Sequence, residues 1–144
     1  MLTEKIKSYL QNKAVELLPK HQEEYTRILK ELGFDSNKNA SFIEFMSVYS
    51  DEHYGSVGLM HDVMNDDLSD SKNGTTQQLR DNYNVPEKYV SLFNLEVDDY
   101  LFYNKEDDSV VLVEGGNDIK LKNEEFDQKW YSFNEFLEHF FELT

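Results

Sequence analysis

Four histidines are the side chains of this sequence best able to act as a general base or to bind a metal ion. His21, His53, His61 and His139 are scattered, and no pair has the H-E-x-x-H spacing of a zinc site. Asp62 follows His61 and could orient its imidazole as a general base, but no G-x-S-x-G nucleophile motif is present. The sequence has no cysteine, which excludes a thiolate metal site and a cysteine nucleophile. We therefore expect no catalytic residue, no metal site and no cofactor.

Two glycine-containing segments resemble ligand-binding loops in composition only. With Gly74 at the sixth position of a calcium loop, two serines and an asparagine would supply the first ligands. Arg80 then occupies the position of the bidentate glutamate, where a cation opposes calcium binding. Residues 55–58 lack the lysine and the hydroxyl residue of a phosphate-binding loop, so we predict a turn there.

Six carboxylates are the best candidates for binding another macromolecule. They form two clusters, Asp66, Asp67 and Asp70 in the first and Glu96, Asp98 and Asp99 in the second. The second cluster lies beside the aromatic side chains of Tyr100, Phe102 and Tyr103. Carboxylates accept paired hydrogen bonds from arginine, and aromatic rings supply desolvated anchors. We predict that both clusters bind a basic partner.

The alternative for each cluster is structural. The first would then be a solvated loop, and the second would cap a turn beside the inward face of a strand. If the first cluster binds the partner, reversing the charges of Asp66, Asp67 and Asp70 together should slow association and leave the fold intact, because loop charges contribute little to stability.

The chain carries a strong and uneven negative charge. Its net charge is −15 at pH 7, and the first 50 residues hold seven acidic and seven basic side chains, so the whole excess lies in residues 51–144. Such a field repels nucleic acids and anionic membranes and attracts basic proteins. The alternative is that the charge serves solubility alone.

The length and hydropathy of the chain indicate a single globular domain. Its 144 residues include ten phenylalanines and nine tyrosines, enough for a ring-rich core without metal or disulfide. No apolar run approaches the roughly 20 residues that a membrane-spanning helix needs. The N-terminus lacks the apolar core of a signal peptide. We therefore expect a soluble protein of the cytoplasm.

Helical periodicity is clearest near the two ends of the chain. Residues 2–18 place apolar side chains at three- and four-residue steps, and Pro19 ends this helix or begins the next. Residues 25–32 repeat the pattern, and Gly33 follows as a helix-ending residue. Residues 132–135 form a capping-box pattern at the start of a C-terminal helix.

The remainder of the chain predicts strands and connections. Residues 42–49 favour a strand, with a short helix as the alternative, and the state of residues 59–64 stays open. Residues 65–74 predict a loop, and Thr75 or Thr76 caps a short helix that runs to Tyr83. Four further strands are predicted, at residues 89–95, 100–103, 110–113 and 119–121. This order predicts an α+β fold, an antiparallel sheet with N-terminal helices and a C-terminal helix packed on it.

The second half of the sequence resembles a known family. The segments 89–93, 98–103, 110–113 and 130–137 resemble the SUKH superfamily, which includes the yeast cell-wall-assembly regulator and many bacterial immunity proteins. The resemblance covers roughly residues 85–143 and implies one domain over residues 1–144 with an α+β fold. It also implies a role without catalysis, the neutralisation of a cognate toxin that is often a nuclease or a deaminase. The family's toxin-binding surface varies, so no site residue is carried over.

Charge and resemblance together favour one function. We expect an immunity protein that binds and neutralises a basic cognate toxin, with no nucleic-acid or membrane partner. One alternative is a cytoplasmic regulatory or scaffolding module, and another is an enzyme or an ion-binding protein. The topology of residues 35–75 and the oligomeric state stay open at this stage.

Overall fold

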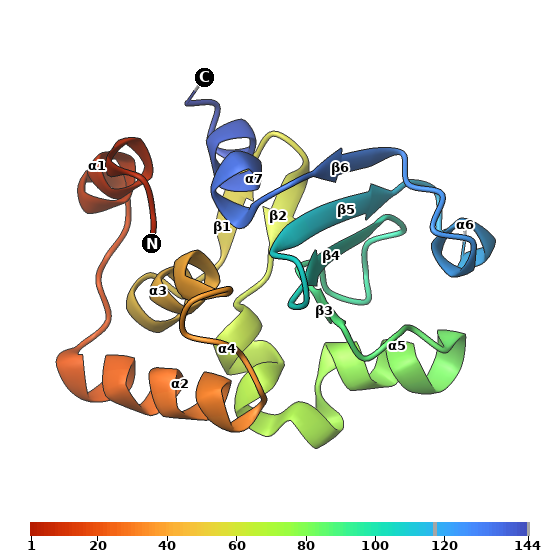
Figure 1. The fold of residues 1–144 in the computed structure, drawn as a ribbon, viewed down its shortest axis with the longest axis horizontal. Helices are drawn as coiled ribbons and strands as arrows, with labels where there is room; N and C mark the ends of the chain where they lie inside the picture. The colour runs from red at the N-terminus through yellow and green to blue at the C-terminus, as the bar shows by residue number, and fades with distance from the viewer. Residues whose placement is uncertain (117, 144) are drawn as a thin grey trace.

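A computed structural model describes residues 1–116 and 118–143. Within them, helices and a small hairpin precede an antiparallel sheet, and a last helix follows it (Figure 1). The elements are α1 (Glu4–Lys13), α2 (Pro19–Glu31), α3 (Ala40–Val48), β1 (His53–Gly55), β2 (Gly58–Met60), α4 (Val63–Asp66), the 3₁₀ segment η1 (Leu68–Asn73), α5 (Thr75–Tyr83), β3 (Tyr89–Ser91), β4 (Tyr100–Asn104), β5 (Ser109–Val113), α6 (Asp118–Lys122), β6 (Gln128–Trp130) and α7 (Phe133–Phe140).

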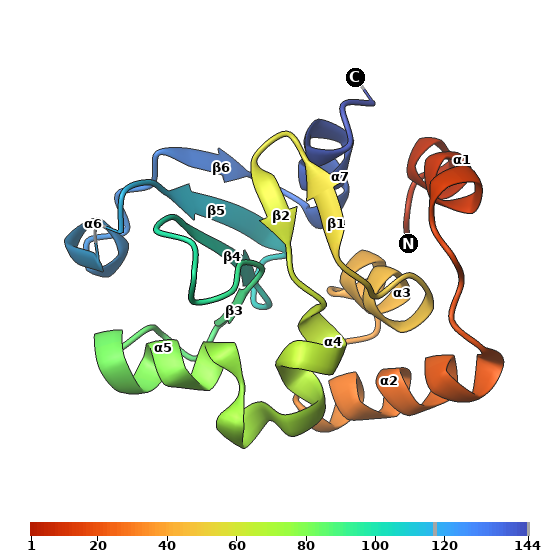
Figure 2. The same ribbon diagram turned by 180° about the vertical axis from the view of Figure 1, so that it is seen from behind.

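The main sheet is an antiparallel meander, with the strands in the order β3-β4-β5-β6. Val90 lies opposite Tyr103, and Leu101 lies opposite Leu112. The β1–β2 hairpin is a separate sheet, and it stands beside α7 when the molecule is seen from behind (Figure 2). The predicted α+β fold, with its antiparallel sheet and its flanking helices, is confirmed.

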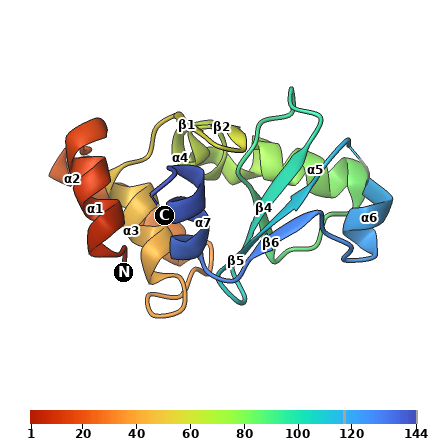
Figure 3. The ribbon, with the colours of Figure 1, turned by 90° about the horizontal axis from the view of Figure 1, so that it is seen from above.

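Both faces of the main sheet are covered by helices. Leu101 and Tyr103 point into the larger core, which also contains side chains of α1, α3 and α7. Phe102 alternates with them along β4 and joins a smaller core with Val111 of β5, which lies opposite it, and with Leu79 of α5. Seen from above, α1, α3 and α7 lie on one side of the sheet and α5 and α6 on the other (Figure 3). Burial on both faces explains why β4 and β5 read as nearly continuous apolar runs.

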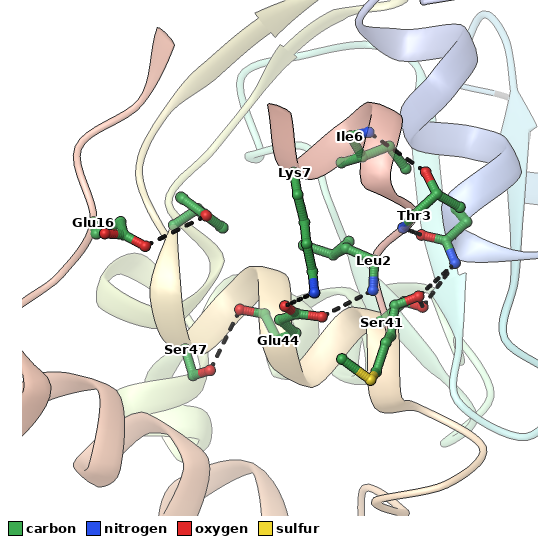
Figure 4. Close-up of polar contacts among 11 residues, drawn as sticks. Leu2, Thr3, Ile6, Lys7, Glu16, Ser41, Glu44 and Ser47 are labelled. Carbon is green, nitrogen blue, oxygen red and sulfur yellow. Dashed lines mark hydrogen bonds and ion pairs between the residues drawn. The ribbon is translucent and has the colours of Figure 1, made fainter. Parts of the chain in front are cut away.

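The N-terminal segment is attached to α3 and α7 by polar contacts (Figure 4). The backbone N–H of Leu2 donates to Glu44 Oε1 at 2.8 Å, and the Lys7 ammonium lies 3.5 Å from Glu44 Oε2. The Ser41 hydroxyl donates to the carbonyl oxygen of Met1, and so does the side-chain amide of Asn134 from α7. These contacts fix the position of α1 against the larger core.

Two predicted helix boundaries are confirmed, and a third is decided between its alternatives. Pro19 is the first residue of α2, where its missing N–H costs nothing, and α1 ends earlier, at Lys13. Gly33 has a φ of 91° after α2, and Phe34 N–H bonds back to Leu29, so the helix ends in a Schellman motif. The Ser132 hydroxyl accepts the Glu135 N–H at the start of α7.

Two strand predictions are wrong because periodicity does not separate short buried segments. Residues 42–49 belong mostly to the helix α3, so the favoured strand is wrong and the short-helix alternative is right. The side chains Phe42, Phe45 and Met46 of α3 are buried, so it shows no polar face. Residues 119–121 lie in α6 rather than in a strand. The fourth strand of the sheet is instead β6, for which no strand was predicted.

Two further segments differ from the prediction in extent. The strand predicted at residues 89–95 is only β3, because the chain leaves the sheet after Ser91. Residues 65–74, predicted as a loop, contain the end of α4 and the 3₁₀ segment η1. The segment at 59–64, whose state was open, divides between β2 and the start of α4.

Candidate functional site

The side chains of His61 and Asp62 are not hydrogen-bonded to each other. His61 is buried, and its Nε2 lies 3.1 Å from the carbonyl oxygen of Ser91, so this nitrogen carries the proton and donates it. The Asp62 carboxylate accepts hydrogen bonds from the Ser50 hydroxyl and from the Asn65 N–H, and it caps α4. Over the described residues, no three acidic or histidine side chains converge in a way that could hold a metal ion.

Two residues of the first predicted cluster lie on the surface. Asp66 and Asp70 are exposed, at the end of α4 and within η1. Asp66 accepts a hydrogen bond from the side chain of Asn65, and both carboxylate oxygens of Asp70 accept from the side chain of Asn73. These local bonds hold the two carboxylates close to their own backbone.

The position of Asp67 contradicts the prediction that all three carboxylates of the first cluster bind a partner. Its side chain is 1% exposed, so it cannot contact a partner, and its carboxylate accepts hydrogen bonds from both the backbone N–H and the hydroxyl of Thr76. Burial raises the pKa of Asp67 above its usual value, and these two hydrogen bonds oppose that shift. Reversing its charge would place a cation in this buried site, so we now expect a triple reversal to disrupt the fold.

Asp67 belongs to a network that seals the edge of the main sheet. The Thr76 hydroxyl accepts the Ser91 N–H at 2.9 Å, and the Arg80 guanidinium donates to the carbonyl oxygen of Tyr89 at 3.0 Å. His61 donates to the carbonyl oxygen of Ser91 on the same edge. These side chains thus form hydrogen bonds with backbone groups of β3 that could otherwise pair with another strand. The sequence signal was Thr76 and Arg80, four residues apart on one face of α5.

The second predicted cluster lies in the connection from β3 to β4. Glu96 and Asp98 are exposed, and Asp99 is half-buried. Asn94 Oδ1 accepts the Glu96 N–H at 2.9 Å and shapes the turn that presents the cluster. The Asp99 carboxylate accepts the Gly115 N–H at 2.9 Å, so this side chain is held toward the turn that follows β5.

A cleft of about 400 Å³ lies between α5 and the β3–β4 connection, beside this cluster. We call it the acidic groove and define it by its lining residues Tyr83, Leu95, Val97, Asp98, Asp99 and Tyr100. Tyr83 is 40% exposed and Leu95 is 48% exposed, so both side chains are accessible to a partner. Within the described residues, no lysine, arginine or histidine lines this groove.

Aromatic rings connect the acidic groove to the smaller core. The ring centroid of Tyr83 lies 6.2 Å from that of Tyr100, and Tyr100 lies 5.9 Å from the buried ring of Phe102. Phe102 and Tyr103 are both buried, so of the predicted aromatic neighbours only Tyr100 reaches the groove. Tyr83 was not among the predicted site residues, although it lies four residues after the buried Leu79 on the same face of α5.

A second cleft, of about 390 Å³, lies on the other side of α5 and has no single charge sign. Its basic side chains are Lys72, Arg80 and Lys105, and its lining also contains three carboxylates, those of Asp67, Asp81 and Glu87. Arg80 is already bound to the edge of β3 and lies 3.6 Å from the Glu87 carboxylate. The acidic groove is therefore the better candidate for recognising a charged partner.

No protein-family model, curated protein or solved structure matches the chain. Of the helices among the described residues, none has both the length and the apolar composition needed to cross a membrane.

Proposed function

We propose that this protein binds a basic partner protein through the acidic groove, and that the partner is a cognate toxin which this contact neutralises. The observation that carries the proposal is the groove itself. It combines partly exposed Tyr83 and Leu95 with the carboxylates of Asp98 and Asp99, and no described basic side chain lines it. Aromatic anchors beside acceptors for charged hydrogen bonds are what a tight contact with a basic protein requires.

The charge distribution supports a basic partner. The whole net charge of −15 lies in residues 51–144, and every residue of the acidic groove belongs to that part of the chain. A field of one sign around a contact site accelerates association with a partner of the opposite sign, and added salt weakens this effect. The partner should therefore associate more slowly as ionic strength rises.

The toxin assignment rests on the resemblance to the SUKH superfamily. A toxin that cleaves or deaminates nucleic acid must present a basic surface to its substrate. An acidic protein that covers this surface would block the substrate by contact and would need no catalysis, metal or cofactor. We propose that this contact takes place in the cytoplasm, where such a toxin would meet nucleic acid.

A capture experiment tests this function. The tagged protein would be mixed with the protein encoded by the adjacent gene, and the bound fraction would be washed at low and then at high salt. We expect capture of a basic protein, elution as salt rises, and inhibition of its nuclease or deaminase activity. If a folded bait captures nothing, or captures a protein without toxic activity, the toxin assignment is wrong and a regulatory module replaces it.

Matched variants assign the contact to the groove. The double variant Asp98→Asn, Asp99→Asn removes two negative charges from the groove, whereas Glu23→Gln, Glu24→Gln removes two from the exposed surface of α2. We expect the first variant to lose capture at a salt concentration that the second still tolerates. Equal loss in both variants would assign binding to the net charge and not to the groove.

A further inference from the structure

We infer that the acidic groove receives an arginine side chain of the partner, stacked on the ring of Tyr83 and paired with the carboxylates of Asp98 and Asp99. The inference rests on the proposed function, and it names the chemical group that this groove recognises. Two features of the site lead to it, the rings that form its walls and the carboxylates at its rim.

The walls of the groove suit a flat cation. The buried side chains of Leu79 and Phe93 also line it, and the two tyrosine rings lie 6.2 Å apart with an angle of 54° between their planes. The rings therefore contact each other, and a guanidinium group can stack on the exposed ring of Tyr83 but not between the two. A guanidinium group stacks on the face of an aromatic ring, and it is less strongly hydrated than an ammonium group. The partly exposed Leu95 offers a surface for the methylene stem of the same side chain.

The rim of the groove is organised before any partner binds. The Gly115 N–H fixes one carboxylate oxygen of Asp99. A side chain at Gly116 would place its Cβ 3.2 Å from the carbonyl oxygen of Asp98, so the turn after β5 packs closely against the β3–β4 connection. A carboxylate that is already oriented loses less conformational freedom on binding than a mobile surface carboxylate does.

The carboxylates of the groove favour a cation, and the flat aromatic surface beside them favours arginine over lysine. The described lining residues contain no basic side chain that would compete for the carboxylates, in contrast to the second cleft with Lys72, Arg80 and Lys105. A lysine ammonium would satisfy the charge, but it is not planar and cannot stack on a ring while forming two parallel hydrogen bonds to one carboxylate.

Titration with single amino-acid probes tests the inference without the toxin. The ¹⁵N-labelled protein would be titrated at low salt with N-acetyl-arginine amide and, separately, with N-acetyl-lysine amide. We expect saturable shifts of the backbone amides of Tyr83, Leu95, Asp98, Asp99 and Tyr100. We expect about threefold tighter binding of the arginine probe, the range of one exposed stacking contact.

Three variants separate stacking from charge. Tyr83→Leu keeps an apolar wall and should remove the preference for arginine, and Asp98→Asn, Asp99→Asn should abolish binding of both probes. Glu23→Gln, Glu24→Gln should change neither. Equal affinity for the two probes in the wild-type protein, or shifts of the same size around Asp66 and Asp70, would overturn the inference.

The two proposals fail separately. Specific arginine binding in the groove, with no toxin captured, would refute the toxin assignment and leave this inference standing. A captured toxin whose affinity is unchanged by Tyr83→Leu would support the function and refute arginine as the group that the groove recognises.

Discussion

The hydroxyl of Thr76 donates a hydrogen bond of 2.6 Å to the buried carboxylate of Asp67. The same hydroxyl oxygen accepts the N–H of Ser91, so one side chain connects a buried charge to the edge of the main sheet. An oxygen that both donates and accepts is polarised by each bond, and removal of the hydroxyl would leave two buried groups with fewer partners. This pair therefore stabilises the position of α5 against β3, and α5 forms one wall of the acidic groove.

Thr76→Val should destabilise the protein by about 2–4 kcal/mol, because valine has the shape of threonine but leaves the Ser91 N–H without its partner and Asp67 with one fewer donor. Urea unfolding followed by circular dichroism would measure the change. The matched control is Thr26→Val on α2, where the hydroxyl bonds only to the carbonyl oxygen of Gln22. Equal effects of the two substitutions would contradict a special role for Thr76.

Asp67→Asn should become more stable relative to the wild-type protein as pH rises. Burial raises the pKa of Asp67 in the folded state, so the folded protein holds this proton more tightly than the unfolded chain does. The stabilisation from this difference is present below the pKa of the unfolded state and is lost as pH rises through the folded-state pKa. Asparagine does not titrate, so the variant lacks this loss.

The measurement is the free energy of unfolding of both proteins from about pH 3 to about pH 8. Taking the difference between the two proteins cancels the carboxylates that they share, including Asp108, whose pKa burial also raises. We subtract the free energy of unfolding of the wild-type protein from that of the variant. If this difference stays constant with pH, or falls as pH rises, the raised pKa assigned to Asp67 is contradicted.

Gly74→Ala should destabilise the protein strongly although its φ of −79° suits alanine. A Cβ at Gly74 would collide with the Asp67 carboxylate and would lie 2.7 Å from the Asp67 carbonyl oxygen, and that backbone atom cannot rotate away. We expect a loss of about 1–3 kcal/mol, the usual cost of inserting a methyl group into a filled site. Thermal unfolding would measure it.

Gly33→Ala is the matched control for this collision. Its Cβ would meet nothing within 4 Å, but the φ of 91° disfavours alanine. This substitution should cost only the backbone preference, about 1 kcal/mol. The steric explanation for Gly74 is wrong if the two glycines respond alike.

The fold was predictable where a local signal marks a helix end or where a helix has one apolar and one polar face. Gly33 and Ser132 mark helix ends by backbone chemistry that acts locally, and the structure has both as predicted, while Pro19 takes one of the two roles left open for it. Helix α3 was assigned to a strand because tertiary packing buries nearly its whole surface, which removes the polar face that identifies a helix. Strand β6 was missed because only Trp130 of its three residues is buried.

The candidate site was predictable only in part, for a similar reason. Glu96, Asp98 and Asp99 lie at the surface or near it, as their polar sequence context indicates. Asp67 has the same context, but a contact with Thr76 nine residues away buries it, and no local pattern reports such a contact. Tyr83 enters the acidic groove only because α5 packs against a connection more than ten residues later in the chain.

Glu44→Ala should loosen α1 without unfolding the sheet. The Glu44 carboxylate accepts the Leu2 N–H and pairs with Lys7, so its loss removes two of the contacts that attach the N-terminal segment (Figure 4). We expect a loss of about 1–2 kcal/mol and faster hydrogen exchange confined to the amides of α1. Glu31→Ala, which removes an exposed ion pair with Arg27, should change neither quantity. Faster exchange throughout the sheet would show that α1 is not an independently detaching element.

Charge reversal should slow association with the toxin at the second cluster more than at the first. Lysine at Glu96 and Asp98 reverses two exposed charges beside the acidic groove, whereas lysine at Asp66 and Asp70 reverses two charges that lie outside its lining. Both variants carry the same net charge, so long-range steering falls equally, and any difference between them comes from the contact site.

We expect the groove variant to associate about tenfold more slowly than the other at low salt, and the difference to shrink as salt is added. Stopped-flow kinetics would measure both rates, after circular dichroism has established that each variant is folded. Equal association rates would remove the acidic groove from the contact, and a slower rate for the variant at Asp66 and Asp70 would move the contact to the first cluster.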